Sequence, residues 1–325
     1  MKYIALLVYT LYWGVHSVHA WGHFAHKKIN ELAVFTLPPE MFLFYKKNIA
    51  YLYDHAADPD KRRYLIPEEG PRHFIDLDKY EQSMPVDTLP HDWEEAVNLY
   101  SEDTLIEHGI GPWYLELMVK KLTYAFKTRD LFRIIKLSND LGHYAADLNV
   151  PLHTTSNYNG QKTQQHGIHA LWESRLPELF AGDYDFWFEP STYVENPRAL
   201  IWKHVSHAHS LVDSVLKVER KVAQSFKPEL IYSYEERGKQ TVRVYSRAFS
   251  KAYHQALGNM VEEQMRQSVQ LVGALWFTAW VNAGQPELHE EAIQVVVPDD
   301  ERELKKEVEK QYQEGTILGR PEPNE

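Results

Sequence analysis

Two pairs of histidine and carboxylate side chains recur with a spacing of four residues in the middle of the sequence. His143 and Asp147 form the first pair, and His169 and Glu173 form the second. Residues four apart share one face of a helix, so each pair can direct two metal-binding groups at one point. His153 lies between the pairs. Together these five residues offer more ligands than one zinc ion, which is usually four-coordinate, can take.

Either pair alone has a plainer interpretation, because an exposed histidine–acid pair on a helix is worth only about 0.5 kcal/mol or less. Tyr144, Ala145, Leu148 and Leu171 are apolar neighbours typical of a buried core. The combination of both pairs with His153 therefore favours a metal site over two surface contacts.

Helical periodicity dominates the segments that must position these residues. The strongest pattern runs from 130 to 150 and ends at Pro151, since proline disfavours a helical residue before it. A second helix is expected over 168–176, stopped by Pro177. Other helices are expected over 24–37, 41–53, 197–226 and 237–281, with loops over 58–80 and an extended piece at 73–78. No repeated strands are evident, so we predict an all-α fold.

The composition restricts the chemistry. Hydrophobic residues make up 44% of the 325 residues, enough for a sizeable core, and there is no cysteine. Any zinc must therefore be held by nitrogen and oxygen ligands. The formal net charge of −11 gives the chain no general attraction for polyanions, so a stable nucleic-acid partner is not expected.

The first twenty residues have the character of a secretory signal peptide. Lys2 provides a positive start, residues 3–15 are apolar, and Val18, His19 and Ala20 form a small-x-small cleavage site. Cleavage between Ala20 and Trp21 would give a periplasmic or secreted protein with a free amine on Trp21. The alternative is an uncleaved membrane anchor.

The segments "HYAADLNVPLH" and "GIHALWE" resemble the zinc-dependent phospholipase C superfamily, which includes the single-strand-specific nucleases of fungi and plants. The segments "WGHFAH", "HAADPDKRRY" and "PRHFIDL" fit the same pattern in the same order. The resemblance covers residues 21–173. It implies a multi-helix bundle built around a trinuclear zinc site.

The resemblance also implies how nine residues would share three Zn²⁺ ions. The first ion would be held by Asp58, His73, His143 and Asp147; the second by His153, His169 and Glu173; the third by the amine and carbonyl of Trp21, by His26, and by Asp147 as a bridge. Zinc ions lower the pKa of a bound water and clamp the oxygens of a phosphate ester. Asp58 would act as the general base or would orient that water.

The function implied is an exported, zinc-dependent phosphoric diester hydrolase of the phospholipase C type, with residues 21–298 as its domain. Its substrate would be a phospholipid or another phosphodiester, with transient contact to a membrane surface. Glu173 resembles the phospholipase branch, since nucleases more often have Asp there. Pro59 and Gly70 stand where choline-specific enzymes tend to place aromatic residues, which argues against a choline cage.

Two alternatives stay open at this point. The first is a single-strand-specific nuclease of the same superfamily, and the second is a non-catalytic periplasmic zinc-binding protein. Asp140, three residues before His143, is a candidate for orienting that imidazole. Residues 299–325 are highly charged, and we expect them to form a frayed helix and a disordered tail.

Overall fold

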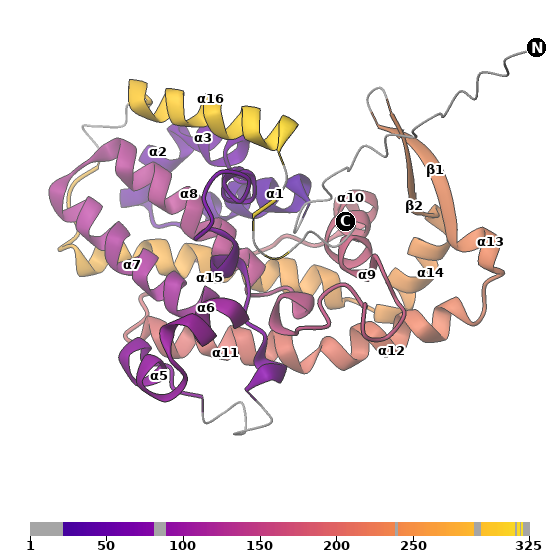
Figure 1. The fold of residues 1–325 in the computed structure, drawn as a ribbon. Helices are drawn as coiled ribbons and strands as arrows, with labels where there is room; N and C mark the ends of the chain where they lie inside the picture. Colours follow the sequence, from indigo (N-terminus) through magenta and orange to yellow (C-terminus); the bar gives the residue numbers. More distant parts are fainter. Residues whose placement is uncertain are drawn as a thin grey trace, which may run out of the picture.

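The computed structural model describes residues 22–80, 89–237, 240–288, 294–315, 317, 318 and 320. Helices pack around one apolar core, with one small β-hairpin at its side (Figure 1). The predicted helical fold class is confirmed. The expected signal peptide and Trp21 lie outside the described residues. Within the described part of the chain, no helix combines the length and apolar character needed to cross a membrane.

The first half contains α1 (His23–Ala33), η1 (Val34–Thr36), α2 (Pro39–Lys47), α3 (Ile49–Asp54), α4 (Asp58–Arg62), η2 (Gly70–His73), η3 (Leu77–Lys79), α5 (Trp93–Tyr100), α6 (Glu102–His108), α7 (Gly111–Thr128), α8 (Leu131–Asp147) and η5 (Pro151–Thr154). The second half contains α9 (Ile168–Ala170), the π-helical η6 (Leu171–Arg175), α10 (Leu176–Phe180), η7 (Ala181–Asp183), α11 (Pro197–Ser210), α12 (Val212–Ala223), α13 (Pro228–Ile231), β1 (Tyr232–Arg237), β2 (Gln240–Tyr245), α14 (Arg247–Leu257), α15 (Met260–Asn282) and α16 (Asp299–Glu314).

Helix α15 is the central element of the core. It packs against α1, α7, α8 and α11, and its Trp276 is fully buried, with its indole N–H donating to the carbonyl of Ser138 on α8. Helix α8 begins at Asp130, whose side chain accepts from the Arg133 amide, a standard N-cap. Because α8 is surrounded by other helices, its second half is buried on every side.

Gly142 allows α1 to approach α8 closely. A Cβ atom at this position would lie 2.0 Å from Oδ1 of Asn30 on α1. The side-chain amide of Asn30 in turn donates to the carbonyl of Asn139 at 3.2 Å. This contact sets the distance between the two helices, and it places His26 of α1 beside His143 of α8.

The structure differs from the expected helix around Pro177. That residue lies in the first turn of α10, and α9, η6 and α10 continue one another from 168 to 180. Proline is tolerated in a first turn because no intrahelical partner is needed for its missing N–H. The wide π-helical turn at 171–175 precedes Pro177 and lets the helical run continue past it. Such turns often occur at functional sites.

The long helices expected over 197–226 and 237–281 are also interrupted. The first divides at Leu211 into α11 and α12. The second begins instead with the β1–β2 hairpin, in which Tyr232 pairs with Tyr245, and continues as α14 and α15. Arg175 of η6 forms an ion pair with Glu235 of β1. This tertiary contact joins the hairpin to the helical body, which a periodicity argument does not reveal.

The helix expected after residue 298 is present, and it is continuous over 299–314 rather than frayed. Helix α16 packs against α4, and its Val308 is buried. Lys61 forms an ion pair with Glu309 at 2.8 Å, and Lys136 forms one with Glu301. The charges that suggested disorder are paired across the helix interface, which composition alone cannot show.

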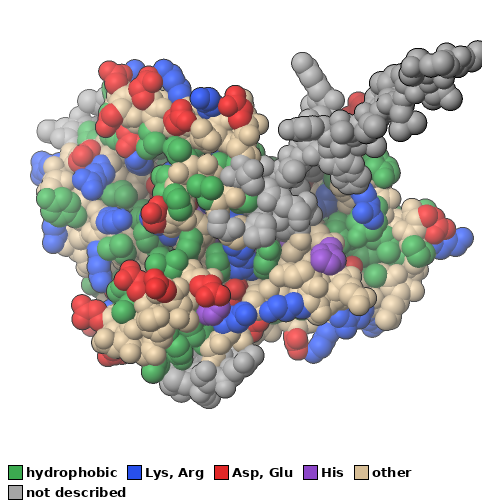
Figure 2. All heavy atoms as spheres, viewed as in Figure 1, with side chains coloured by type: hydrophobic (Ala, Val, Ile, Leu, Met, Phe, Trp, Pro, Cys, Tyr) green, Lys and Arg blue, Asp and Glu red, His purple; other side chains and the backbone are tan. Residues whose placement is uncertain are grey.

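The surface mixes charges of both signs. Figure 2 shows acidic and basic side chains interspersed over the visible face, including along α16 at the top. Histidines are scarce on this face (Figure 2), because most of those singled out in the sequence are buried. The histidine-rich region therefore lies inside the molecule.

Candidate metal centre

Three groups of side chains within the described residues place nitrogen or oxygen atoms within 4.8 Å of one another, as metal ligands would. Their members are His26, Asp60 and His143; His73, His143 and Asp147; and His153, His169 and Glu173. Every member is buried. The residues come from seven separate elements: α1, α4, η2, α8, η5, α9 and η6.

Asp147 joins these groups. Its Oδ2 lies 2.8 Å from Nδ1 of His73 and 3.2 Å from Nε2 of His143. Its Oδ1 lies 3.4 Å from Nε2 of His26 and 4.0 Å from Nδ1 of His153. One carboxylate at the end of α8 therefore faces histidines from four elements. Such a position would suit a carboxylate that bridges two metal ions.

Backbone carbonyls fix the orientation of two histidines. Nδ1 of His143 donates to the carbonyl of Ala56 at 2.9 Å, and Nδ1 of His153 donates to the carbonyl of His73 at 2.7 Å. A carbonyl oxygen can only accept, so in the neutral imidazole the proton lies on Nδ1 and Nε2 keeps its lone pair. Metal-binding histidines are commonly held in this way.

Glu173 completes a separate triangle with two histidines. Its Oε2 lies 2.9 Å from Nε2 of His169 and 3.2 Å from Nε2 of His153. The rings of His153 and His169 meet edge to face with centroids 4.8 Å apart. The π-helical turn positions Glu173 while leaving His169 one turn earlier. The spacing of four residues noted in the sequence thus produces the expected convergence.

Several buried polar atoms at the centre have no hydrogen-bond partner among the described residues. They include both carboxylate oxygens of Asp60, Oδ1 of Asp147, Oε1 of Glu173 and both ring nitrogens of His26. Burying an unpaired polar group costs about 1–3 kcal/mol, and more when it is charged. A divalent cation would satisfy these oxygens and nitrogens together. Carboxylates and imidazoles without thiolates suit zinc, although they accept other divalent metals as well.

The electrostatics of the centre favour positive charge beside its carboxylates. Burial opposes ionisation of Asp60 and Asp147, but the neighbouring His143 outweighs it and holds the pKa of both carboxyls well below the usual range. Burial lowers the pKa of His26 and of His169, so these imidazoles stay neutral and can act as ligands. The carboxylates are thus ionised beside positive charge, which Asp147 and Asp60 favour on His143 by raising its pKa against the effect of burial; a bound metal ion would supply that charge instead.

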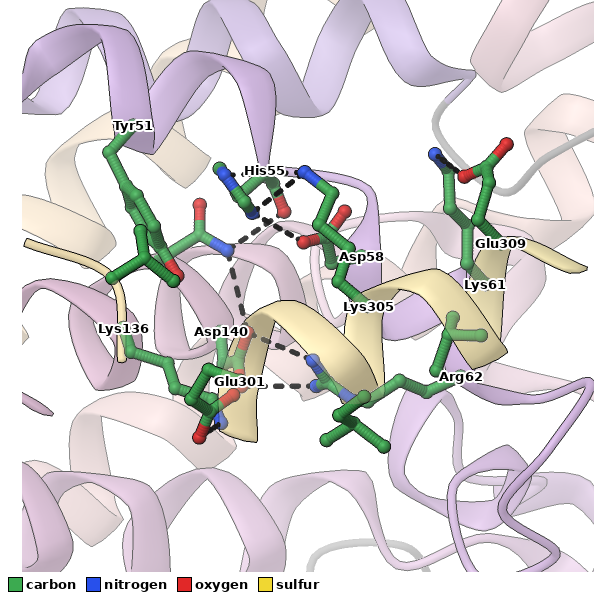
Figure 3. Close-up of a pocket in the computed structure, with 14 residues that line it drawn as sticks. Tyr51, His55, Asp58, Lys61, Arg62, Lys136, Asp140, Glu301, Lys305 and Glu309 are labelled. Carbon is green, nitrogen blue, oxygen red and sulfur yellow. Dashed lines mark hydrogen bonds and ion pairs between the residues drawn. The ribbon is translucent and has the colours of Figure 1, made fainter. Parts of the chain in front are cut away.

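Asp58 lies outside all three groups, in contrast to the expectation that it is a ligand and general base. Its Oδ2 accepts from Nδ1 of His55 at 2.6 Å, and it lines a pocket beneath α16 together with Lys305 (Figure 3). Asp60 instead faces the centre, with Oδ1 3.5 Å from Nε2 of His143 and 3.6 Å from Nδ1 of His73. Residues two apart on a helix point in different directions, so only one of the two acids can reach the centre.

The imidazole of His143 is oriented by the Ala56 carbonyl rather than by Asp140, the residue expected to do so. Arg62 donates to both carboxylate oxygens of Asp140, at 3.3 and 3.0 Å (Figure 3). An acid three residues before a histidine on a helix shares its general face. Here the Asp140 carboxylate pairs with Arg62 of α4 instead of with the His143 imidazole.

Glu69 is a residue that the sequence analysis missed. It is fully buried, and its Oε1 lies 3.7 Å from Nε2 of His73. Arg62 and Arg72 form ion pairs with its Oε2, and the hydroxyl of Tyr144 donates to its Oε1. These contacts fix Glu69 behind His73, on the side away from Asp147. Its position four residues before His73 was the available signal.

The start of α1 lies against the element that carries Glu173. The amide of Gly22 donates to Oγ of Ser174 at 3.1 Å. A Cβ atom on Gly22 would meet the same hydroxyl at 2.9 Å, so the approach is close. Trp21 is outside the described residues, and its proposed role as a ligand stays a prediction.

The sequence matches no protein-family model and no curated protein. Fold and site together define a mostly helical domain with three buried groups of histidine and carboxylate side chains that could hold metal ions.

Proposed function

We propose that the chain is an exported, zinc-dependent phosphoric diester hydrolase of the phospholipase C type. The observation that carries this proposal is the sharing of His143 between two adjacent ligand groups, with Asp147 reaching toward both. Metal ions held close together supply an activated water and neutralise the charge that develops on a phosphate ester. A group with one ion and a closed ligand set would serve a structural role instead.

The ligand groups of the centre support two different roles, one in binding substrate or water and one in accepting a proton. His153, His169 and Glu173 offer three protein atoms, which is the number that catalytic zinc sites use while keeping one position open. Asp60 has two buried oxygens without a hydrogen-bond partner among the described residues. One oxygen can bind a cation while the other accepts a proton. Asp60 thus replaces Asp58 as the acid proposed at this centre.

Trp21 would complete the centre after removal of the signal peptide. The hydrogen bond from Gly22 to Ser174 supports this part of the proposal, because it holds the neighbouring residue beside Glu173. A neutral terminal amine, with a reference pKa of about 8, is a good nitrogen ligand for zinc. Export and completion of the metal centre would then be linked.

The proposed substrate is a phospholipid headgroup ester, reached by transient contact with a membrane surface. The net charge of −11 supports a lipid over a nucleic acid, because an acidic surface repels a polyanion. A single-strand-specific nuclease and a non-catalytic zinc-binding protein are the competing functions, and each predicts a different outcome in the same assay.

The test combines metal analysis with a substrate panel. Mature protein is expected to contain three zinc ions per chain and to release nitrophenolate from bis-p-nitrophenyl phosphate. Assays with phosphatidylethanolamine, phosphatidylcholine and single-stranded DNA then distinguish a phospholipase from a nuclease. Bound zinc without hydrolysis of any diester would identify a binding protein, and fewer than two zinc ions per chain would overturn the multi-metal centre.

A further inference from the structure

The guanidinium group of Arg320 is enclosed by two aromatic rings and two oxygen acceptors. Its central carbon lies 3.6 Å from the ring centroid of Tyr158 and 4.1 Å from that of Phe74. Nη1 donates to Oδ1 of Asp76 at 2.8 Å, and Nη2 donates to the carbonyl of Thr155 at 3.2 Å. The Arg320 side chain is only 15% exposed. These four residues, Phe74, Asp76, Thr155 and Tyr158, are called the cation pocket below.

The cation pocket adjoins the metal centre. Phe74 follows His73 directly, and the carbonyl of Thr155 lies two residues after His153. The amide of Ile75 donates to the carbonyl of His153 at 2.9 Å, which ties the two segments together. The ring of Tyr158 meets that of His169 with centroids 6.2 Å apart. The pocket walls are thus extensions of the segments that carry His73 and His153, and Tyr158 also contacts His169.

Arg320 itself comes from a different part of the chain. It follows α16, and two hydrogen bonds with Arg63 hold this end: the Leu318 amide donates to the Arg63 carbonyl at 2.9 Å, and the Arg63 side chain donates to the Arg320 carbonyl at 2.9 Å. The pocket walls belong to residues 74–158, so the C-terminal end contributes only the cation. Its departure would leave the buried carboxylate of Asp76 without its ion pair.

The groups that line the pocket suit cations that carry N–H donors. Two aromatic faces attract any cation, including a quaternary ammonium. The Asp76 carboxylate and the Thr155 carbonyl add two acceptors, which only a protonated nitrogen can satisfy. Burial raises the pKa of Asp76 against the opposing pull of Arg320, so an ionised Asp76 needs a cation at this position.

We propose that the cation pocket is a substrate subsite that binds the primary ammonium group of the alcohol in a phosphodiester, and that Arg320 occupies it in the resting chain as an internal competitor. The substrate class rests on the proposed phosphodiesterase function, whereas binding of a cation by the pocket does not. A tethered competitor acts at an effective concentration in the millimolar range, so it can keep the pocket closed to weak ligands. An ethanolamine ester is favoured over a choline ester, because choline lacks N–H donors.

The first experiment measures binding without catalysis. Methylguanidinium is titrated into Arg320→Ala protein and followed by the NMR signals of tyrosine and phenylalanine ring protons. We expect saturable binding in Arg320→Ala, and at least about tenfold weaker binding in Arg320→Ala/Asp76→Asn, since the ion pair with the Asp76 carboxylate is lost. Arg247→Ala changes an exposed arginine at the start of α14 and is the matched control, expected to behave like the unchanged protein. Absence of saturable binding to folded Arg320→Ala would overturn the subsite.

The second experiment measures substrate preference with two esters that differ only in one group. 4-Nitrophenyl 2-aminoethyl phosphate carries an ammonium where 4-nitrophenyl propyl phosphate carries a methyl. In Arg320→Ala the ratio of their kcat/KM values is expected to favour the aminoethyl ester by about tenfold, the scale of a desolvated cation–π contact. Asp76→Asn in the same background should bring the ratio close to one.

The two experiments separate the claims. Hydrolysis of both esters at equal rates by Arg320→Ala would refute the substrate assignment. Cation binding without any hydrolysis would leave the pocket standing and would refute the phosphodiesterase function. A preference for 4-nitrophenyl phosphorylcholine over the aminoethyl ester would show that the two acceptors do not select for N–H donors and would overturn the proposed ligand class.

Discussion

Asp58 and Asp60 are two residues apart on α4, yet their carboxylates lie in different environments. Asp58 accepts a hydrogen bond from His55 beneath α16 (Figure 3), whereas Asp60 is buried against His143 and His73. The two residues are of the same type, but their side chains point to different sides of α4. This relationship supplies a matched pair of substitutions within one helix turn.

Asp60→Asn should reduce the bound metal and lower diesterase activity by more than about 100-fold, above the effect typical of a residue that only orients a ligand. The amide cannot supply the negative charge that the centre uses to hold a cation. Asp58→Asn should keep its metal and lose less than about 1 kcal/mol of unfolding free energy, since it loses one charge near the surface. Metal analysis and the bis-p-nitrophenyl phosphate assay check both variants. Loss of metal and activity in Asp58→Asn but not in Asp60→Asn would show that Asp58, and not Asp60, is the ligand.

Removal of the metal should destabilise the protein markedly. Asp60, Asp147 and Glu173 contribute buried carboxylates, and without a metal ion the positive charge beside them comes from His143 and His153, whose pKa values these acids raise against burial. A ligand at about 1,000 times its Kd stabilises the folded state by about 4 kcal/mol, which corresponds to a Tm change of roughly 10 °C for a chain of this size. Calorimetry of chelated protein, with zinc added back as the control, measures the shift. An unchanged Tm after verified loss of metal would contradict a multi-metal core.

Gly142→Ala should cost about 2 kcal/mol of unfolding free energy, because the new Cβ would overlap the Asn30 side chain and force α1 away from α8. Chemical denaturation measures the loss. Gly182→Ala is the control, since a Cβ there meets nothing within 4 Å. In an Asn30→Ala background the cost should shrink, and a cost that stays the same in both backgrounds would locate the strain elsewhere.

The sequence was informative where chemistry follows from local spacing. The pairs His143–Asp147 and His169–Glu173 are four residues apart, so a helix of any kind brings each pair together. The helical class likewise follows from local rules, and the structure confirms it. These features need no knowledge of what lies across the core.

Tertiary structure alone decided which acid of α4 enters the centre, because the direction of a side chain depends on how a short helix is docked rather than on its order in the chain. The same reason explains Glu69, which became visible only once Arg62, Arg72 and Tyr144 were seen to converge on it. Composition marked residues 299–325 as a solvated tail, yet α16 finds partners for its charges on α4 and α8. Ion pairs between segments more than 200 residues apart leave no periodic pattern in the sequence. The position of Arg320 beside the candidate metal centre could therefore be learned only from the fold.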